Sequence, residues 1–491
     1  MSDSSAAPDQ AEVLAAVPKQ LLIGGEWRDA AGGGALAVED PATGEALVEI
    51  ADGQPQDALA ALAAAADAQA EWAKHPPRER GEILRRAFEA IVARTDELAL
   101  LMTLEMGKSL AESRAEISYA AEFFRWFSEE AVRVHGRYMV NTTGKGRILT
   151  MRQPVGPCVF VTPWNFPTAM GTRKIAPAIA AGCTMVVKPA QQTPLSMLAL
   201  AQILVEAGLP AGVLNVITAK RSGEVIEPLL KDPRTRKLSF TGSTEVGRRL
   251  IEQSAEQILR VSMELGGNAP FLVFEDADLD AAVEGAMLAK MRNVGEACTA
   301  ANRFHVHESL AEEFARRMAE RMGALKVGPG TDPGTDVGPL IDEAQRSKVA
   351  ELVADAGERG ARVLIGGEPV GERGYFYAPT VLDRVPEDAR LLAEEIFGPV
   401  APVVAFSSDE QAIAAANRTE YGLVAYVYTR DLDRAFRVSE GIETGMVGLN
   451  QGVVSNPAAP FGGVKQSGFG REGGFEGIGE YLETKYVALA V

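Results

Sequence analysis

The stretch CVFVTPWNFPTAMGTRKIAPAIAAGCTMVVKPA, residues 158–190, decides the fold. Its runs at 158–162 and 184–188 are short, apolar and rich in valine, which predicts two strands. The segment between them, near residues 168–181, predicts a helix. A helix that joins two consecutive strands is typical of parallel pairing, because parallel strands need a long crossover connection. This stretch therefore predicts one unit of an α/β sheet.

The same alternation continues downstream. Further strands are predicted at 213–218, 237–240 and 260–265, and helices at 194–207, after Ser222 and after Ser243. Five strands joined by helical crossovers indicate a doubly wound parallel sheet. Ligands of such sheets bind beyond the carboxyl ends of the strands. We therefore expect the residues that end or follow these strands to share one crevice: Asn165, Lys188, Gly242 and Glu264.

The segments around this sheet are helical or belong to a second α/β stretch. Helices are predicted at 57–74, 77–106 and 109–133, and the first twenty residues are expected to fray. A second α/β stretch begins at residues 270–276, with strands near Phe304, Val403 and Val424. The tail from residue 460 is glycine-rich and then β-like, which predicts a strand that pairs with another segment or another subunit.

Length and composition bound the class of protein. A chain of 491 residues with 46% hydrophobic residues predicts two large domains or three unequal ones. A net charge of −18 argues against a surface that binds nucleic acid or an anionic membrane. Three cysteines cannot build a disulfide framework and indicate a reducing compartment, so we expect a cytoplasmic protein. We expect neither a signal peptide nor a membrane-spanning segment.

Two glycine-containing segments are candidate phosphate loops. GFGREG (468–473) matches the dinucleotide fingerprint, but no strand immediately precedes it and too few residues follow it, so we set it aside. In SFTGSTEVGRR (239–249), Gly242 and Ser243 follow a strand and open a helix, whose free N–H groups suit a pyrophosphate oxygen. An ordinary serine N-cap is the alternative. Lys188 either extends to solvent or binds ribose and phosphate.

Three polar residues are candidates for chemistry. Cys298 lies among small residues in RNVGEACTAANR, where it is either structural or a nucleophile that a substrate can approach. Glu264 precedes two glycines, so it is either a solvated strand-end carboxylate or a general base with room for water. Asn165, between two prolines, belongs to a plain loop or is a fixed amide donor for an oxyanion. The histidines and cysteines show no metal-ligand spacing, so no metal site is expected.

Seven segments carry a resemblance to a known family: VTPWNFP, VVKPA, FTGSTEVG, MELGGNAP, GEACTAANR, EEIFGP and PFGGVKQSG. They stand in the order found in the aldehyde dehydrogenase superfamily, which the chain resembles over nearly its whole length. The resemblance implies a Rossmann-like, doubly wound NAD(P)-binding domain at 20–137 and 156–266, interleaved with an α/β catalytic domain at 267–460. It also implies a small β oligomerisation element at 138–155 and 470–491, in a homodimer or homotetramer.

The resemblance also implies roles for individual residues. Cys298 matches the nucleophile, Asn165 the oxyanion-hole amide that works with the Cys298 backbone N–H, and Glu264 the general base. NAD or NADP is the implied cofactor, and eight residues fall on cofactor-contacting positions: Trp164, Lys188, Gln191, Gly242, Ser243, Leu265, Glu395 and Phe397. Relatives that prefer NAD often carry glutamate where this chain has Gln191, so we expect weak discrimination between the two cofactors. Ala300 stands where some relatives have a second cysteine that enables a redox switch.

Within the superfamily the chain is most similar to the succinate-semialdehyde dehydrogenases. Arg173, Arg292 and Ser455 fall where that family holds the distal carboxylate of the substrate, a role that suits two guanidinium groups and a hydroxyl. The structural alternatives are a surface position for Arg173 and a helix-dipole contact for Arg292. The implied reaction is NAD(P)+-dependent oxidation of succinate semialdehyde to succinate through a thiohemiacetal and a thioester. Glutarate semialdehyde, a broader aldehyde range and a non-catalytic nucleotide-binding relative are the alternative functions.

Overall fold

The five strands expected from the sequence form the centre of an eight-stranded sheet. In the computed structural model, which describes residues 8–490, they run parallel in the order β11-β10-β7-β8-β9. Their bounds are β7 (Cys158–Val161), β8 (Met185–Lys188), β9 (Leu214–Val216), β10 (Lys237–Thr241) and β11 (Arg260–Glu264). The doubly wound α/β core is therefore confirmed.

The two edges of this sheet are antiparallel. At one edge, β1 (Leu21–Ile23) pairs with β9 and with β2 (Glu26–Arg28). At the other edge, β19 (Gly468–Phe469) pairs with β11. GFGREG thus contributes an edge strand rather than a βαβ phosphate loop, as its setting in the sequence indicates. Very short edge strands leave few unpaired backbone groups exposed.

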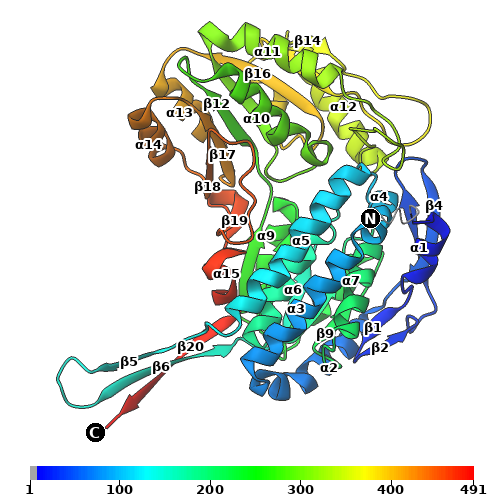
Figure 1. The fold of residues 1–491 in the computed structure, drawn as a ribbon, viewed down its shortest axis with the longest axis vertical. Coiled ribbons are helices and arrows are strands. Elements are labelled where there is room, and N and C mark those ends of the chain that lie inside the picture. Colours follow the sequence, from blue (N-terminus) through cyan, green and yellow to red (C-terminus); the bar gives the residue numbers. More distant parts are fainter. Residues whose placement is uncertain (1–7, 491) are drawn as a thin grey trace, which may run out of the picture.

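Helices cover both faces of the sheet. Alternate strand residues point to opposite sides, so Phe160 and Val187 join one hydrophobic cluster, and Val159 and Val186 join another. Figure 1 shows the helices that build the first cluster side by side. These helices are α3 (Pro77–Ala93), α4 (Thr95–Met106), α5 (Leu110–Glu130), α6 (Ala169–Ala181) and α7 (Leu195–Glu206). The second face is covered by α2 (Pro55–Lys74), α8 (Ser222–Lys231) and α9 (Thr244–Ala255).

Two expectations for the N-terminal part are corrected. The single helix expected at 77–106 is two helices, because Arg94 departs from helical geometry at φ −108° and ψ 22°. Part of the segment expected to fray forms α1 (Gln10–Ala16), which begins with the Asp9 side chain accepting two backbone N–H groups. A β-hairpin follows, made of β3 (Ala35–Asp40) and β4 (Glu45–Ala51).

The expected second α/β stretch forms a seven-stranded sheet in the order β14-β15-β16-β13-β12-β17-β18. Its strands are β12 (Ala269–Val273), β13 (Ala301–His307), β14 (Arg362–Ile365), β15 (Thr380–Asp383), β16 (Val400–Phe406), β17 (Val424–Tyr428) and β18 (Met446–Leu449). Its helices are α10 (Leu279–Met291), α11 (Glu308–Gly323), α12 (Glu343–Glu358), α13 (Asp409–Asn417) and α14 (Leu432–Gly441).

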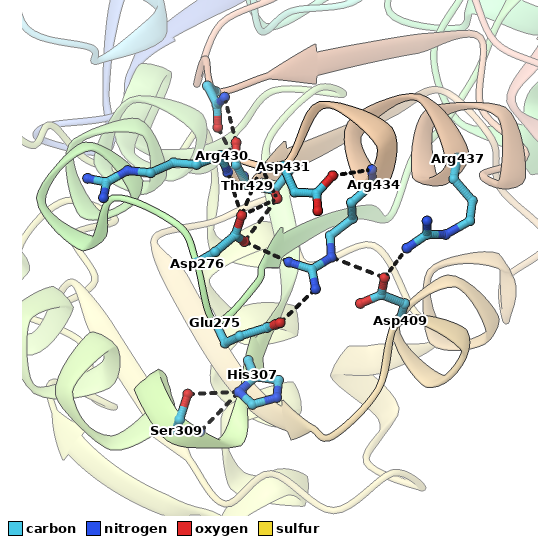
Figure 2. A network of polar contacts seen from close by, with 11 residues as sticks. Glu275, Asp276, His307, Ser309, Asp409, Thr429, Arg430, Asp431, Arg434 and Arg437 are labelled. Atoms are coloured by element: carbon cyan, nitrogen blue, oxygen red, sulfur yellow. Dashed lines mark hydrogen bonds and ion pairs between the residues drawn. The ribbon is translucent and has the colours of Figure 1, made fainter.

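A network of charged side chains ties α13 and α14 to this second sheet (Figure 2). Arg434 on α14 contacts Glu275 at 2.6 Å, Asp276 at 2.7 Å and Asp409 at 3.0 Å. The side chain of Arg434 is 14% exposed, so these pairs are less screened than ordinary surface pairs. The network supports the packing of two helices and contributes no residue to the site described below.

A three-stranded arm projects from the body of the molecule (Figure 1). It consists of β5 (Arg137–Val140), β6 (Arg147–Pro154) and the C-terminal strand β20 (Leu482–Leu489). The tail strand therefore pairs within its own chain, with Leu482 opposite Pro154 and Leu489 opposite Arg147. Before it, α15 (Gly474–Gly479) returns the tail to the first sheet. Within residues 8–490, no helix has the length and hydropathy that a membrane crossing requires.

Candidate active site

A cavity of about 220 Å³ lies where the two sheets meet. Ten of the residues nominated from the sequence line it: Trp164, Asn165, Arg173, Gly242, Ser243, Glu264, Leu265, Cys298, Glu395 and Phe397. The first seven come from the eight-stranded sheet and its connections, and the last three from the part of the chain that builds the second sheet. Among these ten residues the separation reaches 233 positions, from Trp164 to Phe397, and the cavity is also lined by Phe461.

Cys298 follows a strained turn at the end of α10. Asn293 and Val294 have φ values of +56° and +58°, a region that a β-branched valine rarely adopts. The Glu112 carboxylate accepts the Asn293 backbone N–H at 2.6 Å, and the Asn293 amide donates to the backbone carbonyls of Asn165 and Glu296 at 2.9 Å. Sequence reasoning missed both Glu112 and Asn293, although α5 and the cysteine segment meet through them.

The thiol of Cys298 is poised by opposing effects. Burial raises its pKa to about 12, and the positive charge of Arg173 acts against that rise. Cys298 is partly accessible, whereas Cys158 and Cys183 are buried, and all three thiols are free. Accessibility and a lining position in the cavity therefore distinguish Cys298 from the two core cysteines.

Asn165 is fixed by hydrogen bonds on both its backbone and its side chain. Its carbonyl accepts the Lys108 ammonium at 2.8 Å, and Lys108 is held in turn by the buried carboxylate of Glu116 at 2.6 Å. One amide N–H of Asn165 donates to the Glu296 carbonyl at 3.0 Å. A primary amide has two N–H donors, so one donor is left for a ligand in the cavity.

Glu264 ends β11 and has its carboxylate inside the protein. Neither carboxylate oxygen has a hydrogen-bond partner among residues 8–490, and the residue is 3% exposed. Burial raises the pKa of Glu264 well above its ordinary value, and the nearby Glu472 raises it further. The glycines that follow allow close approach, because a Cβ at Gly267 would lie 2.7 Å from the Cys298 carbonyl oxygen.

Arg173 belongs to a buried charge cluster. Its Nε and Nη2 lie 2.8 Å and 2.6 Å from one oxygen of Glu472, and Lys174 contacts the other oxygen. The guanidinium also stacks on Phe461 at 3.9 Å. Burial raises the pKa of Glu472, but the two cations overcome this and lower it to about 2. With 1% exposure, Arg173 is not the surface residue that the alternative interpretation required.

Glu472 is the functional neighbour that the sequence gave least reason to find. It lies in the discarded GFGREG segment, 299 positions from Arg173. The edge strand β19 places it there by pairing with β11, the strand that ends at Glu264. No local pattern links these segments, so only the three-dimensional fold reveals the contact.

The start of α9 has the features of a phosphate-binding turn. Ser243 is its N-cap and accepts the Val246 N–H at 3.4 Å. A Cβ at Gly242 would lie 2.4 Å from the Phe240 ring, so a larger residue would not fit there. The Thr241 hydroxyl is buried and has no partner in the described chain. A helix start with free donors beside an open cavity fits the diphosphate of NAD or NADP.

Glu395 and Phe397 reach the cavity from the opposite side. Glu395 accepts the Gly267 N–H at 3.0 Å, and burial raises its pKa to about 7 despite this hydrogen bond. Phe397 has φ +55°, and Gln345 holds its backbone carbonyl at 2.7 Å. Its ring meets Trp164 edge-on, with ring centres 5.3 Å apart. These contacts close the cavity over the segment that contains Cys298.

Lys188 and Gln191 do not line this cavity. Lys188 ends β8, which pairs with β7, and donates to the Ser222 hydroxyl at the start of α8. Burial lowers the pKa of Lys188 to about 8. Gln191 lines a separate cavity together with Lys220. A crevice that Lys188 shares with Asn165, Gly242 and Glu264 stays a prediction.

Arg292 and Ser455 form a separate pair near the nucleophile. Arg292 Nη1 donates to the Ser455 hydroxyl at 3.2 Å, and the guanidinium lies 5.0 Å from the centre of the Phe166 ring. No carboxylate lies within ion-pair distance of Arg292 in residues 8–490. Neither Arg292 nor Ser455 lines the cavity described above; Arg292 lines a small separate cavity together with Ala297 and Thr299, which flank Cys298 in the chain. The part of the chain that the structure describes contains no metal-ligating cluster of histidine, cysteine or carboxylate side chains.

The chain belongs to the aldehyde dehydrogenase family, whose model matches residues 27–487. The resemblance read from the sequence and the fold class are therefore confirmed. The chain is 60% identical to a succinate-semialdehyde dehydrogenase of Paenarthrobacter nicotinovorans over 90% of this chain and 99% of that protein. It is 49% identical to a glutarate-semialdehyde dehydrogenase of Pseudomonas putida KT2440, over 96% and 98%. The crystal structure of an Escherichia coli NADP-dependent enzyme superposes with a TM-score of 0.96 at 49% identity, covering 99% and 100%.

Proposed function

We propose that this enzyme oxidises succinate semialdehyde to succinate with NAD+ or NADP+. The observation that carries the proposal is the pair of Arg292 and Ser455 beside Cys298, since Arg292 has no carboxylate partner in residues 8–490. A guanidinium without a partner suits the distal carboxylate of a short semialdehyde. The 60% identity to a succinate-semialdehyde dehydrogenase supports the same substrate.

The proposed chemistry uses three residues of the cavity. The Cys298 thiol gives up its proton to water, and the thiolate attacks the aldehyde carbon, so that a carbon–sulfur bond forms as the carbonyl double bond opens to the oxyanion of a thiohemiacetal. The free N–H of the Asn165 amide and the Cys298 backbone N–H stabilise the oxyanion. NAD(P)+, when bound along the α9 start and Glu395, supplies the oxidant that accepts a hydride. Glu264 then removes a proton from water, which attacks the thioester on Cys298 and releases the acid.

We propose that Arg173 contributes less than Arg292 to binding of the substrate. Its position in the cavity wall supports contact with the substrate carboxylate. Glu472 neutralises much of its charge, however, and holds two of its nitrogens. We therefore assign the main electrostatic attraction to Arg292. Glutarate semialdehyde is the second candidate substrate, because the chain is also 49% identical to a glutarate-semialdehyde dehydrogenase.

The cofactor contacts, the assembly and the compartment belong to the same proposal. Lys188 and Gln191 are proposed to contact the ribose, and Trp164, Gly242, Ser243, Leu265, Glu395 and Phe397 the rest of the dinucleotide. The arm exposes Tyr138, Met139 and Tyr486 at 65%, 47% and 60%, which supports a homodimer or homotetramer joined through it. Three free thiols support a cytoplasmic location.

A panel of aldehydes with each nicotinamide cofactor tests the proposal, followed by the absorbance of the reduced cofactor. Succinate semialdehyde should have the highest kcat/KM, above glutarate semialdehyde and well above butanal, its uncharged counterpart of equal chain length. The Cys298→Ala variant should bind cofactor but produce no reduced cofactor with any aldehyde, because it lacks the only proposed covalent attachment point. Turnover by that variant, or equal kcat/KM for butanal, would contradict the proposal.

A further inference from the structure

Tyr119 occupies a position that the proposed mechanism has not used. It lies on α5 and packs against a small apolar cluster that includes Phe166, Met170 and Ala297. Its ring also meets Phe123 edge-on, with centres 5.0 Å apart. Ala297 directly precedes the nucleophile Cys298 in the chain. The tyrosine thus packs against the residue that precedes the thiol and against Met170, which lines the cavity.

The hydroxyl of Tyr119 is an unused donor inside the protein. It is buried and makes no well-formed hydrogen bond among residues 8–490, and the Ser455 hydroxyl is its nearest polar neighbour of the substrate-binding candidates. Burial raises the pKa of Tyr119, while Arg173, Arg292 and the Ser455 hydroxyl are close enough to lower it in part. The hydroxyl therefore stays protonated and lies among the groups nominated for the substrate carboxylate. Buried polar groups without partners are uncommon in native proteins, and one that lies beside free arginine donors is a candidate to bind a ligand or water.

Arg292 has unused donors on the same side. Its guanidinium lies 5.7 Å from the centre of the Tyr119 ring and donates one hydrogen bond, to Ser455. An arginine has five N–H donors, so several remain for a ligand. Arg173 differs because Glu472 already holds its Nε and Nη2. The free donors near Tyr119 therefore come mainly from Arg292.

We propose that the Tyr119 hydroxyl, together with Arg292 and Ser455, holds the distal carboxylate of the substrate and selects for it. This inference rests on the proposed function and adds a specificity-determining residue to it. A carboxylate accepts about four hydrogen bonds, which matches two hydroxyls and a guanidinium. Tyr119 donates its O–H to one carboxylate oxygen, and its buried hydroxyl gains the partner that it otherwise lacks.

The Tyr119→Phe variant tests the proposal, because it removes the hydroxyl and keeps the ring that packs against Phe166 and Arg292. We expect kcat/KM for succinate semialdehyde to fall about tenfold to a hundredfold, the usual effect of losing a hydrogen bond to a charged group. The loss for butanal, which has no carboxylate, should be several-fold smaller. Tyr138→Phe is the matched control, because Tyr138 is 65% exposed on the arm. The ratio of kcat/KM for succinate semialdehyde to kcat/KM for butanal should be the same in this variant as in the wild type.

Binding of the product provides a readout that does not depend on turnover. Calorimetric titration with succinate should show weaker binding to Tyr119→Phe than to the wild type, by a similar factor. Unchanged succinate affinity, or equal kinetic losses on both aldehydes, would overturn the role of Tyr119. A different result would contradict the proposed function itself: a wild type that does not prefer succinate semialdehyde to butanal. If the wild type has this preference and Arg292→Gln removes it but Tyr119→Phe does not, only the inference about Tyr119 is wrong.

Discussion

Replacing Arg173 by methionine removes one of the two cations that hold the buried carboxylate of Glu472. The wild-type contacts are the two Arg173 nitrogens at 2.6 Å and 2.8 Å and the Lys174 ammonium. Methionine keeps an apolar chain of similar length against Phe461. The variant therefore isolates the charge and its hydrogen bonds from the packing of the helix.

The pKa of Glu472 sets the scale of the loss. It falls from the ordinary 4.5 to about 2 in the folded protein. At about 1.4 kcal/mol per unit, this depression corresponds to roughly 3 kcal/mol of stability at neutral pH. Lys174 retains part of it, but the variant also loses the attraction between the guanidinium charge and the Phe461 ring, so we expect a net loss of roughly 2–3 kcal/mol. For a chain of this size the midpoint of thermal unfolding should drop by roughly 4–10 °C.

The pH dependence has a defined sign. A carboxyl group whose pKa is lowered by folding stabilises the protein above its unfolded pKa and loses that contribution as the pH falls toward its folded pKa. For Glu472 this window runs from 4.5 down to about 2. The difference in thermal midpoint between wild type and Arg173→Met should be largest at neutral pH. It should shrink as the pH is lowered below 4.5.

Scanning calorimetry with two further variants checks the reasoning. Arg316→Met is the control, because Arg316 is 59% exposed and pairs only at the surface. Glu472→Gln should be more destabilising than Arg173→Met, since it removes the one carboxylate that ion-pairs with both buried cations in residues 8–490, whereas Arg173→Met leaves the pair of Glu472 and Lys174 intact. A midpoint for Arg173→Met equal to that of Arg316→Met would refute the argument, and so would the reverse order of the two buried variants.

The same ion pair decides which arginine is the better probe of substrate binding. Sequence reasoning favours Arg173, because Arg292 lies six positions before the nucleophile. In the structure, removal of Arg173 disturbs Glu472 and, through it, the pKa of Glu264. Kinetic losses from Arg173 variants should therefore affect charged and uncharged aldehydes alike. Arg292, which has no acidic partner within residues 8–490, is the cleaner test of the carboxylate contact.

Two further predictions concern the base and the cofactor. Glu264→Gln should give a burst of reduced cofactor and then a steady state roughly a hundredfold or more below wild type, because only thioester hydrolysis needs the base. Burial raises the pKa of Glu264, so the steady-state activity of the wild type should rise with pH as the carboxyl group ionises. Stopped-flow traces of Glu264→Gln should lack that rise. A steady-state rate equal to that of the wild type would exclude Glu264 as the base. Gln191→Glu should shift the ratio of kcat/KM values roughly tenfold toward NAD+, because a carboxylate repels the 2′-phosphate of NADP+. An unchanged ratio in cofactor titrations would mean that other residues read the ribose.

The sequence was sufficient for the parts of the fold that depend on local pattern. Each predicted strand of the central sheet matches an observed strand to within two residues at either end, because buried parallel strands are continuous apolar runs. The break at Arg94 was missed because the helical pattern of apolar residues continues on both sides of it, although Thr95 and Asp96, residue types common at helix starts, follow it. The antiparallel edges were missed because β19 and β2 have only two and three residues. Strands of this length carry no periodicity.

For the candidate site, the sequence predicted the residues at strand ends, but it did not predict the residues that contact them from distant segments. Asn165, Gly242 and Glu264 line one cavity because the carboxyl ends of adjacent parallel strands meet at one sheet edge. Lys188 ends the strand next to β7, but its side chain donates to Ser222 at the start of α8 and does not line that cavity. Glu472 escaped notice because its contacts depend on a tertiary pairing across 299 positions. Long-range charge pairs leave no periodic trace in a single sequence.

The edge strand β19 and the carboxylate of Glu472 have a consequence for biosynthesis. Arg173 leaves the ribosome 299 residues before Glu472. At about 5–20 residues per second, this interval lasts roughly 15–60 s. Throughout it, the part of the chain that builds the eight-stranded sheet has one sheet edge without its last strand and two cations without their counter-ion. The nucleophile, the base and the amide donor are all translated by then, yet their surroundings are incomplete. The enzyme therefore matures at the end of its own synthesis, when its C-terminal segment folds back onto the first-made half.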